Sequence, residues 1–189
     1  FDYKAYETSE TDCEYVVTDC RTGKAVYLSE RHNGKRLMRI AKASCSVPFV
    51  CPMTELDGEL YLDGGISDSI PIRHAMERGY EKNIVILTRE KGYQKPVTGK
   101  PQRLRRMLYR DYPGLVRQLE SRNQRYNETI KYLEKTGVRA EGIADPPRKV
   151  LVSRADNNTK RMEAFYRQGY ETADKKLGEI RDFICSGKE

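Results

Sequence analysis

The pattern of apolar and polar positions changes from short runs in the first half of the chain to long helical stripes in the second. The short runs predict strands at residues 14–18, 25–28, 60–62 and 84–87, and helices at residues 35–43 and 72–78. Residues 84–87 are four apolar residues without alternation, which is typical of a strand covered on both faces. The order strand 60–62, helix 72–78, strand 84–87 predicts a right-handed parallel unit.

Two helical stripes dominate the second half. After a polar loop at residues 90–102, apolar side chains recur at helical spacing over 113–136. A short strand is predicted at residues 149–152, and Asn158 or Thr159 is suited to cap a final helix. The apolar stripe of that final helix predicts packing into a core, through Met162, Phe165, Tyr166, Gly169, Tyr170, Ala173, Leu177, Ile180 and Ile184.

The composition is more polar than that of a typical domain. The 189 residues are sufficient for one domain with a core, but charged residues make up 33% of them against about 25% in typical domains. Central strands are the most apolar part of a doubly wound sheet. The composition is therefore compatible with two alternatives. One is a sheet that lacks its central strands, and the other is a polar, mainly helical domain. No apolar stretch approaches 18 residues, so no membrane span is predicted.

The cysteine and histidine content argues against a metal site. Five cysteines occur without a Cys-x-x-Cys pair, and two histidines are present to complete a site. Zinc is therefore not expected, and neither is any other cofactor. An odd number of cysteines favours a reducing compartment, which predicts a cytoplasmic location, in solution or at a membrane surface.

The candidate chemistry lies in residues 61–71, Tyr-Leu-Asp-Gly-Gly-Ile-Ser-Asp-Ser-Ile-Pro. A strand that ends at Asp63 determines where the carboxylate points, and Gly64 and Gly65 carry no side chains to keep backbone or substrate away. An ordinary Asp-Gly turn after a strand has the same local pattern. The flanking residues therefore decide between the two interpretations.

Those flanks resemble the patatin-like phospholipases. The matching elements are an Ala-Ser helix end and Pro-containing loop at 43–52, a Gly-x-x-Tyr-x-Asp-Gly-Gly strand and turn at 58–65, Pro71 opening a helix, and a return strand ending in Leu-Thr at 83–88. Several elements in the right order are more specific than a lone Asp-Gly.

The resemblance extends more weakly in both directions. Residues 16–27 look like the strand, turn and strand that precede this core in bacterial members. Residues 112–115, Arg122 and residues 126–127, with the last fifty residues, look like the C-terminal extension of one bacterial branch. This predicts a division into the C-terminal part of a catalytic core at 1–90, a basic linker at 91–112 and a helical extension at 113–189.

The resemblance implies an α/β fold: an incomplete parallel-sheet core segment followed by a mainly helical extension. It also implies a serine lipid acyl hydrolase with a Ser-Asp dyad, in which Asp63 is the general base and Gly64 and Gly65 complete the motif. The family's nucleophile sits in a Gly-x-Ser-x-Gly elbow before the Asp. This sequence has none, because Ser69 stands where residues 65–69 would need the second Gly.

Because the chain also starts with Phe1, we expect it to be the C-terminal portion of a longer polypeptide. By itself it is predicted to be inactive, since the nucleophile would lie outside these residues.

Other combinations of residues give weaker evidence for a catalytic or metal site. His74 follows Asp63 in the order of a Ser-Asp-His hydrolase but falls in the first turn of a helix, and His32 reads as a loop residue. Cys45 has no basic neighbour in sequence to activate it. Asp63 and Asp68 match neither the Asp-x-Asp pattern nor a calcium loop.

The formal charge of +7 suggests a second kind of function, the binding of an anionic surface. A basic segment, Lys100, Arg103, Arg105, Arg106 and Arg110, is interleaved with Leu104, Met107, Leu108 and Tyr109. It suits peripheral contact with an anionic membrane, where a lipid hydrolase works, and a solvated helix face has the same composition. No nucleic-acid motif is present, so no nucleic acid is expected as a partner.

The alternative to the enzyme is a non-catalytic patatin-like scaffold or a basic lipid- or nucleic-acid-binding domain.

Overall fold

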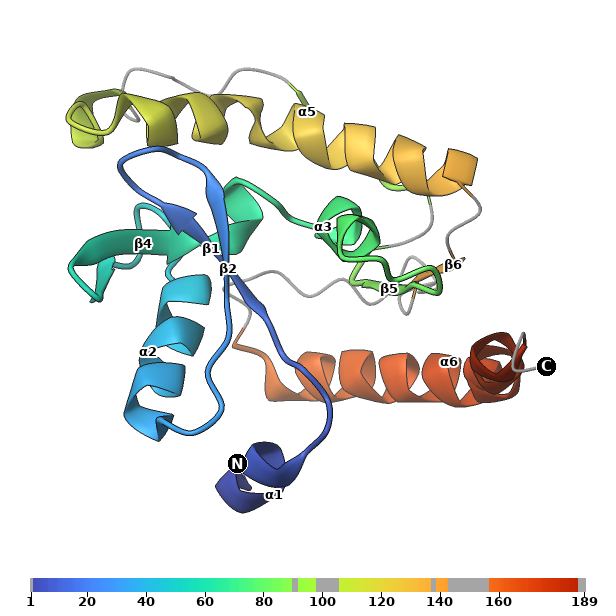
Figure 1. Cartoon of the computed structure of the whole chain (residues 1–189). Coiled ribbons are helices and arrows are strands. Elements are labelled where there is room, and N and C mark those ends of the chain that lie inside the picture. Colours follow the sequence, from blue (N-terminus) through green and yellow to red (C-terminus); the bar gives the residue numbers. More distant parts are fainter. Residues whose placement is uncertain (1, 90–91, 98–105, 137–138, 143–156, 187–189) are drawn as a thin grey trace. The chain divides into compact units, whose positions relative to one another are not determined.

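The computed structural model describes residues 2–89, 92–97, 106–136, 139–142 and 157–186 (Figure 1). The chain divides into two compact units. The first comprises Phe1–Pro71 and Lys95–Thr129, and the second comprises Ile72–Gln94 and Ile130–Glu189. The predicted division at residues 90 and 112 remains a prediction, and each unit is described by itself.

The first unit contains a four-stranded antiparallel sheet. Its strands are β1 (Tyr15–Asp19), β2 (Ala25–Leu28), β3 (Thr54–Leu56) and β4 (Glu59–Asp63), in the order β2-β1-β4-β3. The turn between β3 and β4 is Asp57-Gly58, with φ of 54° and 84°. A two-residue hairpin turn of type I′ requires positive φ at both of its central residues. Strand β3 was not predicted, although this Asp-Gly pair is its local signal.

Helix α2 (Gly34–Ser44) packs against β1, β3 and β4. The Asn33 side chain caps it by accepting a hydrogen bond from the backbone N–H of Arg36, and its buried residues are Leu37, Ile40 and Ala43. The predicted helix at 35–43 is thereby confirmed. A shorter helix, α1 (Tyr3–Thr8), precedes the sheet and was not predicted.

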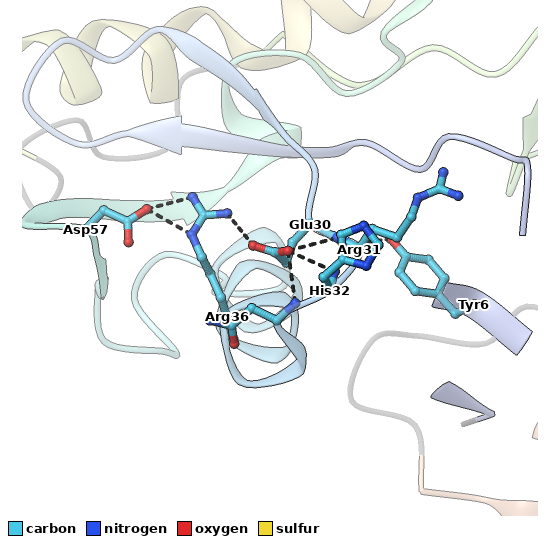
Figure 2. Close-up of polar contacts among 7 residues, drawn as sticks. Tyr6, Glu30, Arg31, His32, Arg36 and Asp57 are labelled. Atoms are coloured by element: carbon cyan, nitrogen blue, oxygen red, sulfur yellow. Dashed lines mark hydrogen bonds and ion pairs between the residues drawn. The ribbon is translucent and has the colours of Figure 1, made fainter. Parts of the chain in front are cut away.

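A polar cluster fastens the start of α2 (Figure 2). The Glu30 carboxylate accepts hydrogen bonds from the backbone N–H groups of residues 31–33. Arg36 bridges two carboxylates, with Nη1 3.2 Å from Glu30 Oε2 and Nη2 2.7 Å from Asp57 Oδ2. The Asn33 and His32 amides, with smaller help from Arg36 and Arg31, hold the pKa of Glu30 below its usual range.

Helix α5 (Pro113–Thr136) forms the main core of the first unit with the sheet. The helix predicted at 113–136 is confirmed. Its core cluster comprises Cys20, Leu62, Ile66, Tyr109, Leu115, Val116 and Leu119. Figure 1 shows α2 and the first turns of α5 on opposite sides of the sheet. The sheet of the first unit is therefore covered by helices on both faces.

Two glycines allow the first turn of α5 to meet the β1–β2 turn. A Cβ on Gly114 would lie 2.4 Å from the carbonyl oxygen of Thr22, and a Cβ on Gly23 would lie 2.4 Å from the carbonyl oxygen of Gly114. Gly23 also has a φ of +75°, a conformation that glycine adopts without strain. The two backbones therefore touch directly, and neither position has room for a side chain.

The second unit contains α3 (Ile72–Glu77), β5 (Ile84–Leu87), β6 (Arg139–Gly142) and α6 (Thr159–Cys185). Strands β5 and β6 pair in parallel. Asn158 caps α6 by accepting from the backbone N–H of Arg161, as the sequence predicts. None of the described residues of α6 is buried, so the prediction that its apolar stripe packs into a core is wrong.

The fold is mixed α/β with a small antiparallel sheet and a helical C-terminal part, and a parallel patatin-like core is not confirmed. Within the described residues, β4 pairs antiparallel with β1 and β3, while β5 pairs with β6. A two-residue hairpin turn such as Asp57-Gly58 can join only antiparallel strands, which explains the direction of β3 relative to β4. The strand at 84–87 exists, but Ile86 is 63% exposed, so it is not covered on both faces. The predicted strand at 149–152 lies outside the described residues.

Candidate active site

Asp63 is the last residue of β4, and its backbone is held on both sides. Its N–H donates to the carbonyl oxygen of Ser46 at 2.9 Å, and its carbonyl accepts from Oγ1 of Thr18 at 2.9 Å. Its Cα lies opposite that of Val17 on β1. Because the backbone on either side of Cα is anchored, the direction in which the carboxyl group leaves the strand is determined by the sheet.

The half-buried Asp63 carboxylate begins the turn that follows. Residues Gly64–Ile66 form a single 3₁₀ turn, and Oδ1 of Asp63 accepts the backbone N–H of Gly65 at 2.7 Å. Within the described residues, Oδ2 has no hydrogen-bond partner in the protein. One carboxylate oxygen therefore maintains the turn, while the other is available to a further donor.

Both glycines of the motif are required for space. A Cβ on Gly64 would lie 2.2 Å from the carbonyl oxygen of Val16, a backbone atom that cannot move aside easily. A Cβ on Gly65 would lie 2.9 Å from Oδ1 of Asp63. Any side chain at position 64 would therefore displace the turn from β1, and one at position 65 would displace the carboxylate.

A second polar layer lies beside the turn. The fully buried Thr18 hydroxyl and the Ser67 hydroxyl are 2.8 Å apart. The Tyr27 hydroxyl donates to Oδ2 of Asp68 at 2.7 Å, and the backbone N–H of Ile70 donates to Oδ1 at 3.3 Å. Both oxygens of Asp68 therefore make structural hydrogen bonds, whereas only Oδ1 of Asp63 does so within the described residues.

Helix α5 brings two arginines to the same turn. Nε of Arg122 donates to the carbonyl oxygen of Gly65, and Nη2 of Arg125 donates to that of Ile66, each at 2.5 Å. Burial lowers the pKa of the Arg125 guanidinium, opposed by the nearby Asp68 carboxylate. Arg122 was noted in the sequence without a site role. Its sequence signals were its place in the resemblance to the bacterial C-terminal extension and its position three residues before Arg125 on the same helix face.

The alternative candidates lie on other elements of the chain than Asp63. His74 lies in the first turn of α3, in the second unit, and the His32 ring contacts Glu7 with 3.3 Å between Nδ1 and Oε1. Cys45 is exposed at the end of α2. Cys20 is fully buried, and this desolvation raises the pKa of its thiol to about 12, so it is inert as a nucleophile.

The basic segment is described in part. Arg106 contacts Glu120 with 3.0 Å between Nε and Oε1, and Arg110 lies 3.6 Å from the Asp111 carboxylate. Between them Met107 and Leu108 are more than half exposed. Lys100, Arg103 and Arg105 lie outside the described residues.

Two features are absent from the described residues. None of their helices is long and apolar enough to cross a membrane. They also contain no group of three or more His, Cys, Asp or Glu side chains that could hold a metal ion.

Comparison with known proteins supports the family for one segment of the chain. Residues 15–76, from β1 into α3, match the family model Patatin-like phospholipase, and Asp63 lies within them. Residues 112–184 match a second model, Domain of unknown function (DUF6363). No curated protein matches the chain. The first match supports the patatin-like phospholipase family, whose members are generally lipid acyl hydrolases that act on lipid substrates.

Proposed function

We propose that this chain is part of a serine lipid acyl hydrolase of the bacterial patatin-like branch, with Asp63 as the general base of a Ser-Asp dyad. The nucleophilic Ser lies outside these 189 residues. One observation carries the proposal: Asp63 ends a strand with one carboxylate oxygen bound to the Gly65 amide and the other without a protein partner among the described residues. The patatin-like match includes this strand and turn.

In the proposed mechanism, Asp63 takes the proton of the Ser hydroxyl as the Ser oxygen attacks the ester carbonyl. The tetrahedral intermediate collapses, Asp63 returns this proton to the departing alcohol oxygen, and an acyl-enzyme remains. Asp63 then takes a proton from the water that attacks the acyl-enzyme and passes it to the Ser oxygen as the carboxylic acid leaves. The contribution of this chain is the placement of one carboxylate, and the Gly65 amide keeps that carboxylate from rotating away.

The test is Asp63→Asn in the polypeptide that also supplies the Ser. Asn has nearly the same shape and keeps an oxygen for the Gly65 N–H, but it cannot accept the proton, so kcat should fall about 10²- to 10⁴-fold. The measurement is kcat on a short p-nitrophenyl ester, with thermal melting to confirm folding. The 189-residue chain alone should show no turnover.

Asp68→Asn is the matched control. It lies five residues later on the same turn. Asn keeps one oxygen to accept from the Tyr27 hydroxyl at 2.7 Å and gives up only the longer 3.3 Å contact with the Ile70 N–H, so turnover should stay near normal. An equal loss in both variants, or near-normal turnover after Asp63→Asn, would remove the dyad.

We also propose that the enzyme is cytoplasmic and acts at a membrane surface. Arg106 and Arg110 flank the exposed Met107 and Leu108, which combines cations with apolar side chains that can enter a lipid interface. The arginine of each ion pair is largely exposed, so the pairs are weak competitors for anionic headgroups. The described part of the chain contains all five cysteines as free thiols, which favours a reducing compartment.

Vesicle binding tests this surface. Sedimentation with anionic vesicles should weaken steeply as salt rises, and the double change Arg106→Gln and Arg110→Gln should reduce it further. Arg117→Gln, an exposed arginine of α5, is the control and should bind like the parent. Equal binding to neutral vesicles, or an unchanged double variant, would assign these arginines to an ordinary solvated surface.

A further inference from the structure

Helix α5 holds the turn that follows Asp63 at two successive carbonyl groups. Arg122 donates from Nε to the oxygen of Gly65, and Arg125 donates from Nη2 to the oxygen of Ile66. Residues three apart lie on the same helix face, so both guanidinium groups come from one side of α5. Both arginines are half-buried, and charge-assisted hydrogen bonds are the stronger kind in such surroundings.

Gly65 links the first of these contacts to the carboxylate. Its N–H donates to Oδ1 of Asp63 at 2.7 Å, and its carbonyl oxygen accepts from Arg122. The point that a Cβ of Gly65 would occupy lies 2.9 Å from Oδ1 of Asp63 and 3.4 Å from Nη2 of Arg122. The guanidinium and the carboxylate therefore flank the same side of Gly65, separated by the space of one absent methyl group.

Helix α5 is itself anchored to the sheet that carries Asp63. Leu115, Val116 and Leu119 pack into one cluster with Leu62 and Ile66, the neighbours of the motif on either side. The close contact between Gly114 and Gly23 fixes the start of the helix. Arg122 thus extends from a rigid support, which is what a group that positions another group requires.

We propose that Arg122 is a positioning residue for Asp63, acting through its hydrogen bond to the Gly65 carbonyl. This inference rests on the proposed function and deepens it. The first helix of the segment that matches the domain of unknown function then completes the general-base site of the patatin-like segment. Arg125 supports the next carbonyl and faces Asp68 electrostatically, so its effect on Asp63 is less direct.

Two near-isosteric variants separate the hydrogen bond from the charge. Arg122→Met keeps the length of the side chain up to Nε but removes the donor there. Arg122→Gln places an uncharged N–H donor at the same distance along the side chain. In the polypeptide that supplies the Ser, Arg122→Met should lower kcat on a short p-nitrophenyl ester about 10- to 100-fold with KM nearly unchanged, because a displaced catalytic group loses rate rather than binding.

Arg122→Gln should recover most of that loss. Arg117→Met, on the exposed side of the same helix, controls for a changed helix and should be near normal in kcat. Unchanged kcat in Arg122→Met, a change confined to KM, or a Gln variant as poor as the Met variant would each overturn the inference. If Arg122→Met does not fold, Arg122→Lys replaces it, since Lys keeps the charge without a donor at the Nε position. Higher kcat in Gln than in Lys then supports the inference, and the reverse overturns it.

The Asp63→Asn background distinguishes this inference from the proposed function. If Arg122 acts through Asp63, adding Arg122→Met to Asp63→Asn should cause little further loss, because the two changes remove one function. Loss in Asp63→Asn with normal kcat in Arg122→Met overturns the positioning role alone. Normal kcat in Asp63→Asn overturns the general base and the positioning role together.

Discussion

Helices α5 and α6 carry similar sequence patterns but are used differently. Both are long, and both carry apolar side chains at helical spacing within the segment that matches the domain of unknown function. Helix α5 buries its stripe: Leu115, Val116, Leu119, Tyr126, Ile130 and Leu133. Helix α6 has no buried residue, and Tyr166 and Tyr170 are about two-thirds exposed.

The difference shows that an apolar stripe predicts a helix more reliably than it predicts what covers the helix. The stripe of α5 meets apolar residues from the sheet, and Gly114 allows the backbones to approach closely. Gly178 in α6 has no atom outside its own helix within 4 Å of where a Cβ would be. Periodicity is a local property, whereas burial requires a second surface.

The largest expected difference between the two helices is in core packing. Leu115→Ala in α5 should destabilise the fold by about 2–5 kcal/mol, because it removes a fully buried side chain and leaves a cavity. Leu177→Ala in α6 should cost about 0.5 kcal/mol or less, since Leu177 is 41% exposed. Urea denaturation of both variants measures this. Similar losses would mean that α6 is packed after all.

A matched pair of glycine substitutions should change stability in opposite directions. Gly114→Ala should destabilise by about 1–3 kcal/mol, because the new methyl group would clash with the Thr22 carbonyl. Gly178→Ala should stabilise by roughly 0.5–1 kcal/mol, because Ala restricts the unfolded backbone more than Gly does and the space at this helical position is open. Melting temperatures of the two variants show the signs directly. A stabilising Gly114→Ala would contradict the close contact at the start of α5.

The smallest expected effect is at α2, whose start is held by charge rather than by packing. The pKa of Glu30 is lowered in the folded state, so its contribution to stability is present above the ordinary Glu pKa of about 4.3 and is lost as pH falls through the lower folded value. Glu30→Gln should therefore lower the melting temperature at neutral pH, and the deficit should shrink as the pH drops below about 4.3.

Melting curves of Glu30→Gln and the parent across this pH range provide the measurement, with the exposed Glu10→Gln as control. A deficit that is constant with pH would show that Glu30 does not act through its charge.

Local signals predicted much of the fold. Helical spacing placed α5 at its observed bounds, and Asn158 was among the predicted caps of α6. The strand before Asp63 and the helix after Pro71 were also predicted, because strand, turn and cap preferences depend on neighbouring residues. The unpredicted β3 had a signal of the same kind, the Asp57-Gly58 turn.

The sequence by itself determined where most of the described helices and strands lie, and that one carboxylate stands before two glycines. Only the tertiary structure decided that the sheet of the first unit is antiparallel, that α5 is buried while α6 is exposed, and that Arg122 donates to Gly65 across 57 positions. The physical reason is range. Backbone preferences act over a few residues, whereas strand pairing, burial and the placement of a guanidinium beside a distant carbonyl depend on which surfaces meet when the chain folds.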